Sequence, residues 1–437
     1  MTEALKQIEA LCDQRKFAQA ERLLADYFEK ETPTAEAWRI QGQIHHTVHR
    51  QYEQAIDCYI AALALEPNSP NILFLLGNLY SKELGDVETG MSYYQRLLKQ
   101  APDDVLLLNN IGANLLQQKQ YKEAMPFFEQ VLQHAQLLEA YLGKGECQLK
   151  IGQTLDAFDT AHHGLIEVSR NDSKPNVRQQ IAGFLLHAAK LYCETMDYDK
   201  IEQALTEQVA QSEGITVRKV ADNRIAQTKL ELSPKNQTAT IRYNKAYPFH
   251  RYAILCQLIS LPLRTPPRPL APTASDELAK RDEGFMSALK KRLPKKEYER
   301  ATSYYCAEMA GFLENTVQQL LIDNIIVALY PKLRPAQVSS LFNREGLHAA
   351  ICKDNVQRAK TPPTHWNARR MMYMVMGMHL ETLYGINFLN NYQPTQVEYN
   401  QACQIYQLYE REIQEPEFKH SQLLDKVAAS LDLSYLW

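Results

Sequence analysis

The chain has 437 residues, 45% of them hydrophobic, and a formal net charge of -3 at pH 7. This length suits two or three globular domains. The near balance of charge argues against a broad surface for nucleic acid or anionic membranes, so we expect no nucleic-acid partner. No apolar run approaches the roughly 20 residues that span a bilayer, and we expect no membrane insertion.

Eight cysteines are distributed singly, and none forms a Cys-x-x-Cys pair. Structural zinc sites usually take their ligands from close pairs, so we expect no zinc finger and no cofactor. Isolated cysteines in helical sequence are typically small buried residues. The chain begins Met1-Thr2-Glu3-Ala4-Leu5-Lys6 and has no apolar segment after a basic start, unlike a secretory signal. We therefore expect a soluble cytoplasmic protein.

An ordered pattern of small and large residues recurs through the first half of the chain. A small residue stands at positions 20, 55, 90, 124 and 157, in steps of 35, 35, 34 and 33. A glycine precedes it and a large residue follows it, as in Gly42 with Tyr59, Gly77 with Tyr94, and Gly112 with Phe128. We expect the glycines and alanines to allow close helix packing, and the large residues to fill the space between units. A self-repeat of about 34 residues predicts stacked pairs of antiparallel helices.

This pattern resembles the tetratricopeptide repeat family over residues 34–168. Residues 4–33 are similar to a degenerate first unit, and residues 175–210 to a weaker sixth helix pair. The second and third units each carry one extra residue between their helices. The resemblance implies an α-solenoid of about five to six helix pairs over residues 1–210, whose inner wall is formed by the first helices. It also implies a non-enzymatic adaptor or scaffold with a protein or peptide partner.

The same register identifies the residues of the inner wall. Chaperone-binding members of the family hold a carboxylate with Lys, Arg and Asn side chains. In this chain Glu139 occupies a position where such a clamp needs Lys or Arg. The wall is mixed polar and apolar, and it either binds a partner or contacts the chain's own second half. The candidate partner-binding residues are Arg39, Gln43, Asn71, Phe74, Asn78, Asn109, Asn110, Glu139, Leu142 and Glu146.

The helical period stops near residue 211. Residues 215–220, 230–232 and 238–243 alternate with a period of two, which is typical of half-buried strands. Residues 233–237 read as a turn between the last two of these strands. We expect residues 211–261 to form a β-hairpin and a helix that open an α+β, mainly helical second domain. The fold class is therefore mostly α.

A strand ending in Ile241-Arg242-Tyr243-Asn244, followed by an apolar helix over 252–260, resembles the entry to a zincin-type metallopeptidase site. Those enzymes carry His-Glu-x-x-His there, to bind zinc and polarise water. This chain has Cys256, Gln257 and Ser260 instead, and neutral glutamine is no general base. The resemblance implies a pseudoenzyme, so a zincin-like metallopeptidase or its inactive descendant is the alternative function. A buried helix behind a hairpin is the other interpretation.

The rest of the chain is predicted to be a proline-rich loop over 262–275 and a helical remainder over 276–437. Three carboxylates, of Glu308, Glu314 and Asp323, are candidates for the relic of an acidic zincin ligand. His348 and Cys352 share a helix face and form a weak candidate metal pair.

Five methionines crowd the helix predicted over 365–384. We interpret it as a central core helix, although an adaptable partner surface or thioether copper ligation would also suit methionine.

Overall fold

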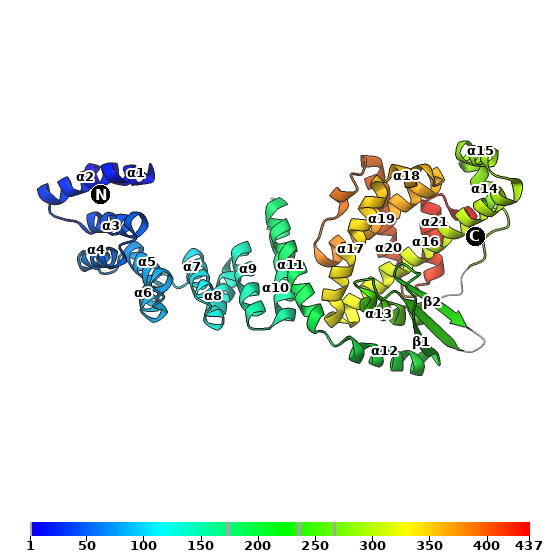
Figure 1. The fold of residues 1–437 in the computed structure, drawn as a ribbon, viewed down its shortest axis with the longest axis horizontal. Coiled ribbons are helices and arrows are strands. Elements are labelled where there is room, and N and C mark those ends of the chain that lie inside the picture. Colours follow the sequence, from blue (N-terminus) through cyan, green and yellow to red (C-terminus); the bar gives the residue numbers. More distant parts are fainter. Residues whose placement is uncertain (1, 172–174, 234–236, 265–267) are drawn as a thin grey trace. The chain divides into compact units, whose positions relative to one another are not determined.

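The computed structural model describes all residues except 1, 172–174, 234–236 and 265–267. The chain is mostly helical with one small sheet, as predicted, and it divides into two compact units, residues 1–177 and 178–437. In the first unit, helix pairs follow one another along the chain (Figure 1). Its helices are α1 (Glu3–Asp13), α2 (Phe17–Lys30), α3 (Ala35–Ile44), α4 (Tyr52–Leu65), α5 (Pro70–Asn78), α6 (Val87–Gln100), α7 (Val105–Gln117), α8 (Tyr121–His134), α9 (Leu138–Lys150) and α10 (Thr154–Asn171).

The glycines of the repeat make room for aromatic rings of the same unit. A Cβ atom added to Gly77 would lie 2.4 Å from the Tyr94 ring, and one added to Gly42 would lie 2.7 Å from Tyr59. Both tyrosines are fully buried. The sequence analysis placed these rings between units. That prediction was incomplete, because each ring also packs against the glycine of its own helix pair.

Two π-helical turns take up the extra residues of the second and third units. Helix α3 continues as the π turn His45–His49, and α5 continues as the π turn Leu79–Glu83. A π turn closes i→i+5 hydrogen bonds and so holds one more residue than an α turn. The predicted insertions therefore lie at the ends of first helices, and the two 35-residue steps of the repeat follow from them.

The second unit combines a three-stranded sheet with long helices. Strands β1 (Thr216–Ala221), β2 (Thr228–Ser233) and β3 (Thr238–Tyr243) lie in the order β1-β3-β2. Strand β2 pairs antiparallel with β3, which confirms the hairpin, although most of the predicted turn lies outside the described residues. Strand β1 pairs parallel with β3, a partnership that the sequence did not predict. The helices are α11 (Pro175–Thr195), α12 (Tyr198–Glu213), α13 (His250–Ser260), α14 (Ala274–Arg281), α15 (Glu283–Arg292), α16 (Lys295–Leu329), α17 (Arg334–Lys353), α18 (Asn355–Ala359), α19 (Pro363–Tyr384), α20 (Gln396–Glu412) and α21 (His420–Ser430).

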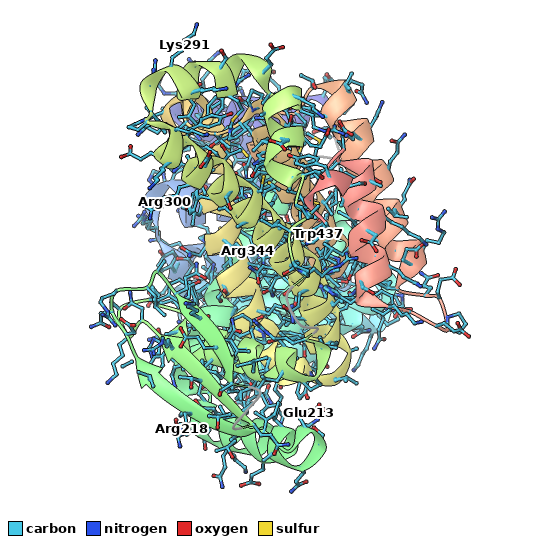
Figure 2. The ribbon with its side chains drawn as sticks, turned by 90° about the vertical axis from the view of Figure 1, so that its right-hand side faces the viewer. Glu213, Arg218, Lys291, Arg300, Arg344 and Trp437 are labelled. Carbon is cyan, nitrogen blue, oxygen red and sulfur yellow. The ribbon has the colours of Figure 1, made fainter. Side chains whose placement is uncertain are left out.

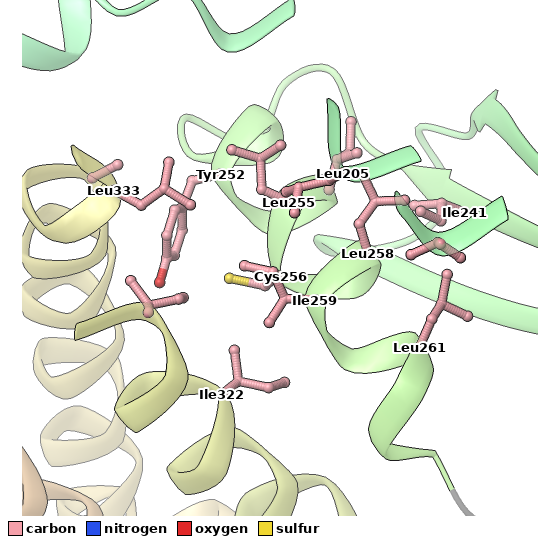
Figure 3. Close-up of a cluster of buried hydrophobic side chains, with 14 of the residues drawn as sticks. Leu205, Ile241, Tyr252, Leu255, Cys256, Leu258, Ile259, Leu261, Ile322 and Leu333 are labelled. Atoms are coloured by element: carbon pink, nitrogen blue, oxygen red, sulfur yellow. The ribbon is translucent and has the colours of Figure 1, made fainter. Parts of the chain in front are cut away.

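One hydrophobic cluster joins the sheet to the helices of this unit. Side chains from α12, β3, α13 and α16 converge in it, among them Leu205, Ile241, Leu255 and Ile322 (Figure 3). Two helices, α11 and α12, are present over the predicted range 175–210, but α12 packs mainly on α13. Helix α12 contributes its apolar face to this cluster and so packs against the sheet.

Helix α19 is the central core helix that the sequence predicted. Met372 and Met374 are completely buried, and Met376 is only 4% exposed. Buried thioethers cannot form a partner surface, so that interpretation of the methionines was wrong. The C-terminus also packs onto the unit, because Leu436 is buried and its carbonyl oxygen accepts a hydrogen bond from the Ala271 amide at 2.9 Å.

Candidate functional site

A hollow of about 230 Å³ lies where the third repeat meets the fourth, and we call it the repeat groove. It is formed by the start of α5, the end of α6 and the start of α7. Its floor is apolar, with Phe74 from α5, Leu97 from α6 and Leu107 from α7. The residues that line it are Pro70, Asn71, Phe74, Leu97, Gln100, Ala101, Asp104, Leu106, Leu107 and Asn110.

An exposed leucine stands at the rim of the repeat groove. The Asp104 carboxylate caps α7 by accepting hydrogen bonds from the amides of Leu106 and Leu107, both at 3.0 Å. The cap fixes the first turn of the helix, where Leu106 points outward and is 71% exposed. A large apolar side chain is thus held in water beside an apolar hollow.

Two asparagine amides also line the repeat groove. Asn71 and Asn110 are exposed, and neither has a side-chain hydrogen-bond partner among the residues that the structure describes. Each amide offers both a donor and an acceptor. The groove therefore combines an apolar floor and rim with free amides, an arrangement that suits a polypeptide segment.

Other predicted wall residues take part in interactions within the repeats. The Arg39 guanidinium donates to Glu9 at 2.6 Å, to Glu36 at 2.8 Å and to Gln43 at 2.8 Å, and its side chain is only 12% exposed. This contact joins α3 to α1. In the next unit, Asn78 accepts a hydrogen bond from the Tyr94 hydroxyl at 2.5 Å. Asn78 also accepts a hydrogen bond from the Asn114 amide of the following repeat at 2.6 Å, so Arg39 and Asn78 both hold repeats together.

The remaining predicted residues lie on α7 and α9, away from the repeat groove. Asn109 is half-buried, and its buried Oδ1 has no hydrogen-bond partner among the described residues. Glu139 and Glu146 are exposed, and Leu142 is half-buried. Sequence reasoning missed Leu106, although it follows Asn71 by 35 residues and so occupies the same position of the next repeat.

A second, larger hollow of about 520 Å³ lies in the second unit between β2, α13, α16 and α17, and we call it the sheet-edge cavity. It contains all three candidate catalytic positions of the sequence analysis. Its lining is mostly polar. The lining residues are Gln227, Thr228, Lys229, Leu230, Tyr247, Tyr252, Ala253, Cys256, Gln257, Ser260, Arg264, Asn315, Gln318, Gln319, Ile322, Ser340, Leu341 and Arg344.

The three candidate catalytic positions have no metal-binding arrangement. Burial raises the pKa of Cys256 to about 12, so its side chain is a neutral thiol. Gln257 donates from Nε2 to Thr228 Oγ1 at 3.3 Å, and Ser260 donates to the Gln257 carbonyl at 2.8 Å. Within the described ranges, no group of three or more His, Cys, Asp or Glu side chains could hold a metal ion. The zincin resemblance has no support in this geometry.

The three candidate relic carboxylates also have other partners. Glu308 pairs with Arg369, and Glu314 accepts a hydrogen bond from the Arg268 amide at 3.5 Å. Asp323 is fully buried and accepts from Gln337 at 3.1 Å.

The candidate metal pair of α17 is likewise part of the core. The His348 ring stacks on Tyr373, with 3.9 Å between ring centroids, and its Nδ1 lies 3.4 Å from a Glu345 carboxylate oxygen. Burial lowers the pKa of His348, which favours the neutral ring. Cys352 is buried, and this raises its pKa to about 11. These contacts explain both residues without a metal ligand role.

Comparison with protein families identifies the repeat. A TPR repeat model matches residues 51–83, and tetratricopeptide repeat models match residues 72–104 and 106–133. The N-terminal half therefore contains tetratricopeptide repeats, as the sequence pattern predicted. No curated protein matches the chain. Among the described helices, none has the length and apolar character needed to cross a membrane.

Solved structures similar to this chain include other repeat proteins. MamA from Desulfovibrio magneticus RS-1 is 22% identical over 37% of this chain and 97% of its own, with a TM-score of 0.27. A tetratricopeptide repeat protein from Parabacteroides merdae ATCC 43184 is 17% identical over 69% of this chain and 96% of its own, with a TM-score of 0.35. PilW, a type IV pilus biogenesis factor, is 19% identical over 41% of this chain and 86% of its own, with a TM-score of 0.27.

Proposed function

We propose that this protein is a non-enzymatic scaffold whose repeat groove binds a segment of a protein partner. The observation that carries the proposal is Leu106, a 71% exposed leucine beside an apolar hollow in the repeats. Large exposed apolar side chains that adjoin a hollow mark interaction sites more often than isolated ones do. The second unit provides a second contact in this proposal. The eight cysteines are all unpaired, which suits the reducing cytoplasm where we place the protein.

The chemistry of the groove defines the partner segment. An apolar side chain of the partner would lie on Phe74 and Leu107 under Leu106, and burial of such a side chain contributes about 1.5–3 kcal/mol. The amides of Asn71 and Asn110 would bond to the partner's backbone. The described residues that line the groove include the acidic Asp104 but no Lys or Arg. The proposed ligand is therefore an internal segment with an apolar anchor, and not a C-terminal carboxylate.

Selection from a phage-displayed library of random linear peptides on the full-length protein tests this function. We expect selected peptides to share an apolar anchor residue. Binding to the Leu106→Asp variant should be weaker by at least about tenfold, because a charge at the rim removes the apolar contact. Leu65→Asp is the matched control, since Leu65 is 54% exposed on α4 and does not line the groove.

Two results would contradict the proposal. One is a selection that yields no peptide with saturable binding. The other is a set of peptides that bind the Leu106→Asp and Leu65→Asp variants equally well, since these would occupy another surface.

A further inference from the structure

We propose that the sheet-edge cavity binds a small anionic ligand through the guanidinium of Arg264. The ligand class is a low-molecular-weight oxyanion, carboxylate or phosphate, whose remaining groups are hydroxyls or amides. This site is in the second unit and does not depend on the repeat groove.

The charge of the cavity lining is one-sided. Among the described lining residues, Lys229, Arg264 and Arg344 are basic and none is acidic. Lys229 is paired with Glu231 at 3.1 Å, and its side chain is 63% exposed, so it contributes little. The electrostatic potential inside the cavity therefore depends mainly on the two arginines.

Arg344 is held by carboxylates that lie outside the cavity lining. Its guanidinium is 3.5 Å from Asp323 and 3.6 Å from Glu345, both fully buried. Glu345 in turn accepts a hydrogen bond from the Tyr392 hydroxyl. Figure 2 shows Arg344 toward the middle of the second unit, whereas Arg218 and Arg300 lie toward its outer edge. Arg344 is thus a fixed and largely neutralised part of the cavity wall.

Arg264 has no such counter-charge. Its hydrogen-bond partner among the described residues is the neutral side chain of Gln257, whose Oε1 accepts from Arg264 Nη2 at 3.3 Å. The buried Nε of Arg264 has no hydrogen-bond partner among the described residues. No described carboxylate forms an ion pair with the Arg264 guanidinium. Burial lowers the pKa of this guanidinium, and no neighbouring charge offsets the effect. A desolvated cation without a counter-ion is unfavourable, and an anion in the cavity would compensate it.

The rest of the lining defines the rest of the ligand. Amides of Gln227, Asn315 and Gln318 and the hydroxyls of Ser340 and Tyr247 line the same cavity. Burial raises the pKa of Cys256 to about 12, so this residue adds no negative charge there. Such a lining can bond to hydroxyl or amide groups, and Leu230, Ile322 and Leu341 add a smaller apolar part. The ligand class that fits is therefore mainly polar, with one anionic end at Arg264.

Equilibrium dialysis of the full-length protein with radiolabelled inorganic phosphate, at constant ionic strength in sodium chloride, tests this site. We expect saturable binding of one phosphate per chain at this site. In the Arg264→Met variant, binding should be weaker by about tenfold or more, since a charge-assisted hydrogen bond is lost. Arg264→Lys should retain part of it. Arg218→Met, which removes an exposed arginine of β1, is the control and should bind like the wild type.

Thermal denaturation in chloride alone distinguishes this role from a structural one. If Arg264 serves a ligand, the Arg264→Met variant should be at least as stable as the wild type without phosphate. The proposal is overturned if no saturable phosphate binding occurs, if Arg264→Met and Arg218→Met bind equally, or if Arg264→Met is markedly less stable in chloride. None of these results would affect the peptide selection on the repeat groove.

Discussion

Asn78 on α5 accepts a hydrogen bond at 2.6 Å from the side-chain amide of Asn114 on α7, so two first helices of neighbouring repeats are joined directly. The Tyr94 hydroxyl completes the arrangement, because it donates to Asn78 and accepts from Asn114, both at 2.5 Å. Asn78, which the sequence placed on the binding wall, therefore couples the third repeat to the fourth. The repeat groove lies at this same junction.

The Tyr94→Phe variant should be less stable than the wild type by roughly 1–2 kcal/mol, because Asn78 and Asn114 lose a shared partner in a largely buried place. Urea unfolding followed by circular dichroism measures this. Tyr93→Phe is the control, since Tyr93 is half-buried and stacks on Tyr80, and it should change stability little. Equal effects at the two positions would show that the network contributes nothing to repeat coupling.

The Gly77→Ala variant should be destabilised by about 1–3 kcal/mol, since its Cβ would lie 2.4 Å from the Tyr94 ring. Gly183→Ala is the control, and we expect it to raise the stability instead of lowering it. A Cβ there meets no atom within 4 Å, and alanine in an exposed helix is favoured over glycine by about 1 kcal/mol. Thermal unfolding of both variants checks the pair, and a loss of stability at Gly183 alone would contradict the packing argument.

Arg344 and Arg264 line the same cavity but should respond oppositely to the same substitution. Arg344→Met leaves Asp323 and Glu345 buried without their shared counter-charge, and we expect a loss of about 3–5 kcal/mol. Arg264→Met removes a buried charge that has no carboxylate partner among the described residues, and it should leave the stability unchanged or raise it. Unfolding curves of the two variants in one buffer make the comparison. Similar losses would mean that both arginines are structural.

Stability should fall on mild acidification because of two buried histidines. Burial lowers the pKa of His365 and of His379 to about 4, whereas in the unfolded chain it is near 6.5. The unfolded state therefore binds more protons between these values, so stability is full above about pH 6.5 and is lost as pH falls toward about 4. Urea unfolding at several pH values measures the slope. The His379→Gln variant should show a smaller slope, and an unchanged slope would exclude this histidine as a cause.

Chelation should have no effect on the protein. The described residues hold no group of metal-ligating side chains, and Cys256, Gln257 and Ser260 have other contacts. We expect the same melting temperature with and without a chelator, and no stoichiometric zinc by elemental analysis of the purified chain. Bound zinc that is lost together with stability would contradict this reading of the cavity.

The repeats could be predicted because their pattern is local. The glycine and the aromatic ring that fills its space, such as Gly77 and Tyr94, lie within one helix pair, so their spacing alone indicates the fold. The same holds for the β2–β3 hairpin. By contrast, the parallel pairing of β1 with β3 brings Thr216 opposite Thr238, and no alternation within either strand specifies such a partner.

The candidate sites were less predictable, for two physical reasons. An exposed leucine such as Leu106 has no distinct sequence signal, because its importance comes from the hollow beside it. The polar network of the second unit joins Asp323 on α16 to Gln337 and Arg344 on α17. It depends on the packing of different helices, and each residue alone reads as an ordinary surface residue.

The two π turns also limit how the repeats can be rearranged. The units with the π turns His45–His49 and Leu79–Glu83 are each 35 residues long, counted from the start of one first helix to the start of the next. The fourth unit, from Val105 to the start of α9 at Leu138, is 33 residues long, and its first helix has no π turn. Exchange of the second unit for the third would preserve the helix register on both sides. Exchange of either for the fourth would instead remove a π turn and two residues from that unit.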